Sequence, residues 1–169
     1  DSDIGYTDMP EYTAGLNTGF SWKNFDFSMQ WTGAWNVDRM LDEFRRPLGD
    51  TNEKGLLLYQ YDTTWRSSAD TFTAKFPRTS SLHASNNYAG SDLYLINASY
   101  LRLKSVEIGY NFNFPFMKKL KMDNCRLYVN GYNLITITGF KWGDPESRQS
   151  SRPNYPLTRV FNIGLKLGF

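Results

Sequence analysis

The chain has 169 residues, of which 40% are hydrophobic and 17% aromatic, and its formal net charge is +2. This length fits one ordinary domain, and so small a charge does not support binding to nucleic acid. The longest uninterrupted apolar run, residues 56–59, is far shorter than the ~20 residues of a membrane-spanning helix. One cysteine, Cys125, and one histidine, His83, supply neither an intrachain disulfide nor a four-ligand zinc site. We therefore expect no metal, no cofactor and no catalytic residues.

Two blocks of alternating side chains near the start of the chain predict an antiparallel hairpin. The strands are expected at about 12–20 and 25–35, and in the second block Met29 and Trp31 belong to an apolar set of odd positions. Such alternation is typical of a strand, because 3.6 residues per helical turn would scatter these side chains around the axis. Only residues 21–24 separate the blocks, a length that suits a hairpin turn.

A third strand is expected at about 100–114, but its alternation changes parity. Apolar residues occupy odd positions at Leu101 and Leu103 and even positions from Val106 onward. A β-bulge near Lys104 and Ser105 would bring both halves onto one face. An upper half that stands clear of the membrane would explain the same pattern, so both interpretations stay open at this point.

Two further strands complete the pattern, at about 126–136 and 158–169. In the last strand every odd position from Phe161 to Phe169 is apolar, and the positions between them are polar or glycine. Each strand is close to the ~9–11 residues that a tilted strand needs to cross a bilayer. The sequence therefore predicts an all-β fold of five antiparallel strands.

The connections and the aromatic residues distinguish two kinds of β protein. Short turns alternate with two long loops, residues 36–99 and 137–157, which is the layout of an outer-membrane β-barrel. Aromatic residues gather at both strand ends, such as Trp22 at the short-turn end and Trp35 at the long-loop end, as in the girdles of a membrane barrel. A soluble sandwich also has one polar and one apolar face on each strand. A secreted β-sandwich module that binds glycans on exposed aromatic residues is therefore the alternative.

Five strands are too few to close a membrane barrel, which starts at about 8 strands. An open sheet edge in hydrocarbon leaves backbone groups unpaired, so we expect an arc that needs partner strands on both edges. The acidic start of the chain is unlike a secretory signal peptide, and we expect the true N-terminus to lie elsewhere in a longer precursor.

The last eight residues resemble the C-terminal signal that the outer-membrane assembly machinery reads on barrel proteins, and Phe169 is expected to be the natural end of the chain. A final strand with free backbone groups and alternating side chains is suited to recognition by strand addition. An ordinary terminal amphipathic strand is the alternative. The candidate signal residues are Asn162, Gly164, Leu167 and Phe169.

Several motifs follow one another along nearly the whole chain. The two most specific are Ser99-Tyr100-Leu101-Arg102-Leu103-Lys104 and the segment 127–134, which ends in Asn133-Leu134. Others lie at residues 12–17, 21–26, 108–110, 143–146 and 155–156 and in the final Gly-Leu-Lys-Leu-Gly-Phe. In order and spacing these motifs resemble the C-terminal end of SusC/RagA-type TonB-dependent transporters.

The resemblance implies an outer-membrane importer of oligosaccharides or peptides in a Gram-negative cell. Its 22-stranded barrel would hold an N-terminal plug, pair with a SusD-like surface lipoprotein that acts as a lid, and be powered through TonB. This chain would supply barrel strands, and the plug and the TonB contact would lie outside it. The resemblance also implies that loops 36–99 and 137–157 are extracellular and that the turns at 21–24 and 115–124 are periplasmic.

The long loop 36–99 contains the candidate contact residues. Aromatic side chains stack on sugars and also form protein interfaces, so we expect some of them to touch the lid or the cargo. The alternative is that they pack the loop against itself. Helical spacing at residues 38–44 also predicts a short helix, with Asn36 as its candidate cap. The candidate contact residues are Tyr59, Tyr61, Trp65, Phe72 and Tyr88.

Overall fold

The computed structural model describes residues 5–41, 58–79, 87, 89–147 and 157–169. The chain divides into two compact units, which are treated separately. The sheet unit comprises residues 11–35, 99–139 and 156–169, and the loop unit comprises residues 1–10, 36–98 and 140–155.

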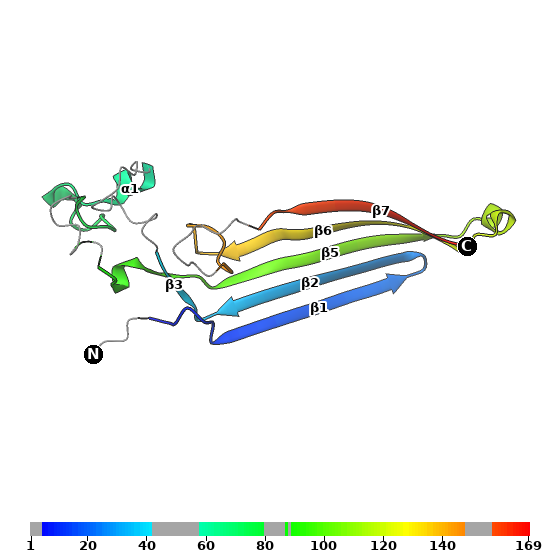
Figure 1. Cartoon of the computed structure of the whole chain (residues 1–169), viewed down its shortest axis with the longest axis horizontal. Helices are drawn as coiled ribbons and strands as arrows, with labels where there is room; N and C mark the ends of the chain where they lie inside the picture. Colours follow the sequence, from blue (N-terminus) through cyan, green and yellow to red (C-terminus); the bar gives the residue numbers. More distant parts are fainter. Residues whose placement is uncertain (1–4, 42–57, 80–86, 88, 148–156) are drawn as a thin grey trace. The chain divides into compact units, whose positions relative to one another are not determined.

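The sheet unit is one five-stranded antiparallel sheet in the order β1-β2-β5-β6-β7 (Figure 1). Neighbouring strands in the sheet follow one another along the chain, apart from β3 and β4, which form a separate pair. The all-β, antiparallel fold class is thus confirmed. The strands are β1 (Tyr12–Trp22), β2 (Phe25–Trp35), β5 (Tyr100–Phe112), β6 (Asn124–Thr138) and β7 (Val160–Gly168).

The two short connections differ slightly from the expected ones. The strands β1 and β2 extend toward each other and leave a two-residue turn, Lys23 and Asn24, in which Lys23 has a φ of 55°. Between β5 and β6 the chain forms a 3-10 helix, η3 (Pro115–Leu120).

A β-bulge in β5 explains the change of parity. Gln30 pairs with Ser105, whereas its neighbour Trp31 pairs with Leu103, so Lys104 is the extra residue. An extra residue in one strand reverses the face on which the following side chains lie. The bulge therefore brings the odd and the even apolar positions of β5 onto the same face, and the first of the two interpretations is confirmed.

The next strand compensates for this bulge with one of its own. Leu103 pairs with Ile135 and Ser105 pairs with Tyr132, so two residues of β6 lie opposite Lys104. One of them, Asn133, has a φ of 53°, a left-handed conformation that asparagine tolerates better than most residues. The apolar face consequently continues across β6 without interruption.

The register produces one apolar and one polar face across all five strands. Residues directly opposite one another lie on the same face, and successive rows alternate between the faces. One row on the apolar face consists of Phe20, Phe27, Ile108, Val129 and Ile163. The neighbouring row on the polar face consists of Gly19, Ser28, Glu107, Asn130 and Asn162.

The large side chains of the apolar face are not covered as those of a sandwich core would be. Ile163 is 73% exposed, Leu165 59% and Leu16 59%. A sandwich buries one face of each sheet against the other sheet. The exposure of these side chains contradicts the β-sandwich alternative for this part of the chain.

The loop unit contains a two-stranded sheet in place of the expected helix at 38–44. The strand β3 (Asp38–Met40) pairs antiparallel with β4 (Leu95–Asn97). Helical spacing over so few residues was a weak signal, and pairing with a strand more than 50 positions away overrides it. Asp38 is buried and its Oδ2 accepts a hydrogen bond of 2.8 Å from the backbone N–H of Tyr6. Residues 42–44 lie outside the described residues.

Short helices and two small apolar clusters complete the loop unit. The helices are α1 (Leu58–Thr63), η1 (Ser68–Asp70) and η2 (Asp92–Tyr94). Within the described ranges, no helix is long and apolar enough to span a membrane. One cluster consists of Val37, Ala98 and Phe140, and the other of Leu41, Phe76 and Tyr94.

Candidate functional site

An ion-pair network lies on the polar face of the sheet and joins three strands. Arg126 of β6 forms ion pairs with Asp26 of β2 and Glu107 of β5. Its Nε donates to Asp26 Oδ2 at 3.1 Å and its Nη2 donates to Asp26 Oδ1 and, at 2.7 Å, to Glu107 Oε1. The arginine thus reaches across the whole width of β5. We call Arg126, Asp26 and Glu107 the Arg126 network.

A glycine in β5 makes this reach possible. Gly109 pairs with Asp26 on one side and Tyr128 on the other. A Cβ atom at Gly109 would lie 2.6 Å from both Arg126 Nε and Asp26 Oδ1. The space above Gly109 is therefore occupied by the ion pair itself, and any other residue would have to displace it.

The network continues to β7 through amide and aromatic side chains. Asn130 Nδ2 donates to Glu107 Oε2 at 3.3 Å, and Asn162 Nδ2 donates to Asn130 Oδ1 at 2.9 Å. Next to them, the Tyr128 ring lies over Gly164, where a Cβ would be 2.7 Å from Tyr128 Cε1. Four strands of the polar face are consequently linked by side chains.

The most specific sequence motif places a buried arginine near the end of the polar face where β5 begins. Arg102 is 1% exposed, and its Nε donates to Thr136 Oγ1 at 3.1 Å. Its guanidinium carbon lies 5.4 Å from the centre of the Tyr100 ring, a cation–π arrangement. The Tyr-x-Arg spacing of the motif thus corresponds to a contact between two side chains of one face.

The five candidate contact residues of the long loop differ in exposure. Phe72 is 98% exposed and Tyr61 is 52% exposed, with the Arg66 guanidinium 4.5 Å from the Tyr61 ring centre. Tyr59 is half-buried against the apolar cluster and meets Trp142 edge-on at 6.3 Å. Tyr59 therefore packs the loop, whereas Phe72 and Tyr61 are available to a partner.

The other two predicted contact residues are Trp65 and Tyr88. Trp65 is half-buried, and its backbone N–H donates to the carbonyl of Phe76 at 2.9 Å. Tyr88 lies outside the described residues. Contact of any of these residues with a lid or cargo remains a prediction.

Hydrogen bonds order the turn that presents Phe72. The Asp70 carboxylate accepts hydrogen bonds from the backbone N–H groups of Ser67 at 2.9 Å and Arg66 at 3.1 Å. These hydrogen bonds lower the pKa of Asp70 below its ordinary value, because they stabilise the charged form. The backbone N–H groups of Thr73 and Ala74 both donate to the Asp70 carbonyl, so the turn is held from both sides.

The candidate assembly-signal residues have distinct positions at the end of the sheet. Asn162 and Gly164 make the contacts with β6 given above, on the polar face. Leu167 is 43% exposed on the apolar face, and Phe169 follows β7 and is 79% exposed. Recognition of these residues by an assembly machinery remains a prediction.

No group of three or more potential metal ligands of the His, Cys, Asp or Glu type occurs among the residues that the structure describes. Cys125 is half-buried in β6. His83 lies outside the described residues.

Sequence reasoning missed Gly109 and Arg126. The alternation placed both on the polar face, but it contained no information about which residues of other strands lie beside them. A glycine opposite an acidic residue and beside an arginine is a usable signal only when the register is known.

No protein-family model matches the chain. A search of curated proteins finds "TonB-dependent receptor P3" of Formosa agariphila, 29% identical over 95% of this chain and 16% of the relative. It also finds "TonB-dependent receptor SusC" of Bacteroides thetaiotaomicron, 28% identical over 92% of this chain and 15% of that protein. The chain therefore spans about one sixth of the length of these relatives.

Solved structures show the same fold. The RagAB peptide importer in its "closed-closed" state matches with a TM-score of 0.76 and 21% identity over 97% of this chain and 18% of that chain. The "open-open" state matches with a TM-score of 0.74.

The sheet, with its apolar and polar faces, therefore has the fold of an arc of a β-barrel, as in the matching RagAB chains. More specifically, the chain is similar over nearly its whole length to part of two TonB-dependent receptors, one of them SusC, and TonB-dependent receptors are outer-membrane proteins of Gram-negative cells. These proteins are named as receptors and as a peptide importer.

Proposed function

We propose that the chain forms part of the barrel wall of an importer that takes up oligosaccharides or peptides together with a SusD-like lipoprotein lid. The remaining strands and the plug would come from the same transporter, and energy would be supplied through TonB by regions outside this chain. The homology to TonB-dependent receptors and the fold shared with the RagAB peptide importer support this proposal.

The observation that carries the proposal is the continuous apolar face of five strands. In a barrel this face would contact lipid, and the face with the Arg126 network would line the lumen. In the described part of the chain β1 and β7 each pair with one neighbour. Partner strands on both of these edges would satisfy the backbone groups that hydrocarbon cannot.

The loop unit is proposed to face the outside of the cell, where lid and cargo arrive. Long loops of outer-membrane barrels are extracellular and short turns are periplasmic. Among the predicted contacts that the structure describes, Phe72 and Tyr61 are the most accessible aromatic residues, and they are the proposed contacts with the lid or the cargo. The ordered turn around Asp70 would reduce the conformational entropy that Phe72 loses on binding.

Two adjacent residues of β2 test the orientation of the sheet. Met29 lies on the apolar face and Gln30 on the polar face. Arginine on the lipid face near the bilayer midplane costs about 2–4 kcal/mol, whereas lumenal substitutions are tolerated. We therefore expect Met29→Arg in the full-length receptor to reduce the amount of folded barrel in the outer membrane, and Gln30→Arg to leave it near the wild-type level.

The measurement is the fraction of heat-modifiable receptor in isolated outer membranes, compared on gels with and without boiling. A tolerated Met29→Arg together with a deleterious Gln30→Arg would reverse the two faces and contradict the proposal. Equal tolerance of both variants, with the protein folded and soluble without detergent, would likewise contradict the membrane orientation.

A further inference from the structure

The segment that precedes β1 is hydrogen-bonded to the small sheet of the loop unit. The backbone N–H of Asp38 in β3 donates to the carbonyl of Thr7 at 3.1 Å. The carboxylate of the same residue accepts a hydrogen bond of 2.8 Å from the backbone N–H of Tyr6. We call residues 5–8 the strap, because both backbone and side-chain atoms of β3 hold them.

The strap is exposed to solvent, whereas the residues that hold it are buried. Each strap residue is exposed, and Tyr6 is exposed to 43%. Asp38 and Arg39 are only 8% and 6% exposed, and Nη1 of Arg39 donates to the carbonyl of Asp8. Neither of the two apolar clusters described above contains a strap residue. Segments that bury little apolar surface open locally at a low cost in free energy, so the strap is able to leave β3 without unfolding a cluster.

Only glycine fits at the first position of the strap. Gly5 has a φ of 112°, in a region that residues with a Cβ rarely adopt. A Cβ atom there would lie 2.5 Å from Asp38 Oδ2 and 2.7 Å from Cδ2 of Leu95 in β4. Any larger residue at position 5 would therefore displace the strap or the carboxylate that holds it.

The small sheet beside the strap is connected by a series of contacts to the turn that presents Phe72. The backbone N–H of Leu41, directly after β3, donates to the carbonyl of Tyr94 at 2.8 Å. The ring of Tyr94 stacks on that of Phe76 with their centres 6.0 Å apart, and these three residues form one buried cluster. The carbonyl of Phe76 accepts the hydrogen bond from Trp65 at the other end of the turn. Both ends of the turn are thus joined to the cluster that β3 supports.

We propose that the strap is a latch for the long loop. While the strap is fastened to β3, it keeps the turn around Phe72 in its ordered position, and its release loosens that turn. The contacts from β3 through the apolar cluster transmit the effect, because packed and hydrogen-bonded segments open as cooperative units. The latch is defined by these contacts alone, and only its consequence for a partner rests on the proposed function.

The experiment compares amide hydrogen exchange in the full-length receptor and in its Gly5→Ala variant, in detergent micelles and by mass spectrometry of peptides. The substitution changes no residue of β3, β4 or the cluster. Loss of one hydrogen bond to a charged group shifts a local opening equilibrium about tenfold. We therefore expect exchange at residues 36–41, 64–76 and 94–98 to become about tenfold faster, and exchange in β2 and β6 to stay at the wild-type rate.

Gly90→Ala is the matched control, because Gly90 also belongs to the loop unit but a Cβ there would meet no atom within 4 Å. It should leave exchange unchanged. Tyr6→Pro is a second release variant, since proline lacks the N–H that binds the Asp38 carboxylate. Only heat-modifiable receptor is analysed, and Tyr6→Pro carries the test if Gly5→Ala does not assemble. Faster exchange confined to residues 5–10, or no faster exchange in either release variant, would overturn the inference.

A photoreactive benzoylphenylalanine in place of Phe72, used in cells, separates the latch from the proposed function. If both hold, the wild type forms adducts with the SusD-like lipoprotein and the release variants form fewer. Faster exchange at residues 64–76 without adducts in any of the proteins would contradict the proposed contact of Phe72 and still support the latch. Adducts that are undiminished in the release variants would refute the claim that the strap positions Phe72.

Discussion

Replacing Gly109 by alanine tests whether the Arg126 network stabilises the sheet. The added Cβ would lie 2.6 Å from Arg126 Nε and from Asp26 Oδ1. Both atoms belong to the ends of flexible side chains, so they can move aside without shifting the backbone. The expected consequence is loss of the ion pair across β5, and not a distortion of the strand.

The size of the effect follows from two opposing contributions. Hydrogen bonds to charged groups contribute about 1.5–3 kcal/mol, but the side chains of Arg126, Asp26 and Glu107 are 21%, 27% and 32% exposed, so we take ~1–2 kcal/mol after screening by solvent. Alanine is favoured over glycine in a strand by roughly 0.5–1 kcal/mol. Gly109→Ala should therefore destabilise the barrel by up to about 1.5 kcal/mol.

The control is Gly168→Ala, a glycine on the same face of β7. A Cβ at Gly168 would have its nearest neighbour at 3.6 Å, an ordinary contact with Asn124. Only the strand preference then changes, and this variant should be more stable than the wild type by about 0.5–1 kcal/mol. The two substitutions are chemically identical, yet we expect effects of opposite sign.

The assay is the urea midpoint of the full-length receptor in lipid vesicles, followed by tryptophan fluorescence. The penalty of Gly109→Ala should shrink in 1 M salt, because salt screens partly exposed charges. In an Arg126→Met background the penalty should disappear, since both changes remove the same contact. A destabilisation that is unchanged by salt and by Arg126→Met would refute the role assigned to the network.

Two other predictions concern the bulge and the turn of the loop unit. Deleting Lys104, the extra residue of β5, should move part of the strand onto the wrong face and abolish folded receptor in outer membranes, whereas Lys104→Ala should assemble normally. Asp70→Ala should accelerate amide exchange of residues 66–74 at neutral pH. Because the pKa of folded Asp70 is lowered, the wild type should keep this protection above the ordinary carboxyl pKa and lose it as pH falls through the folded value.

Much of the sheet could be predicted from the sequence because the alternation of side chains along a strand is local. The expected strand at 25–35 coincides with β2 (Phe25–Trp35), and the parity change at Lys104 marked the bulge. The helix expected at 38–44 was wrong at Asp38–Met40, because those residues pair with β4, which lies far away in the sequence. Local spacing contains no information about such a partner.

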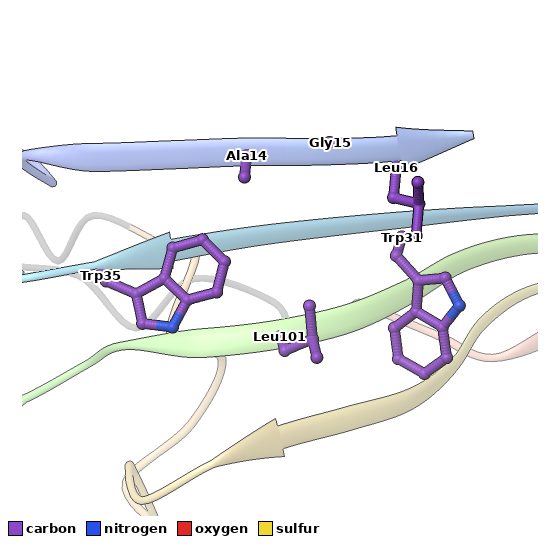
Figure 2. A pocket seen from close by; sticks show the side chains of 6 residues that line it. All are labelled: Ala14, Gly15, Leu16, Trp31, Trp35 and Leu101. Atoms are coloured by element: carbon purple, nitrogen blue, oxygen red, sulfur yellow. The ribbon is translucent and has the colours of Figure 1, made fainter. Parts of the chain in front are cut away.

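The polar and apolar faces of the sheet also combine features that follow from local alternation with features that depend on pairing between distant strands. Within each regular stretch of strand the sequence by itself determined which side chains share a face, since the backbone turns successive residues to opposite sides. Only the tertiary structure decided that Arg126 meets Asp26, 100 positions away, above Gly109, and that the Trp35 ring, seen in Figure 2, lies over Gly33. These contacts depend on the register between strands, which is set by pairing over long distances and by a bulge of one residue in each of β5 and β6.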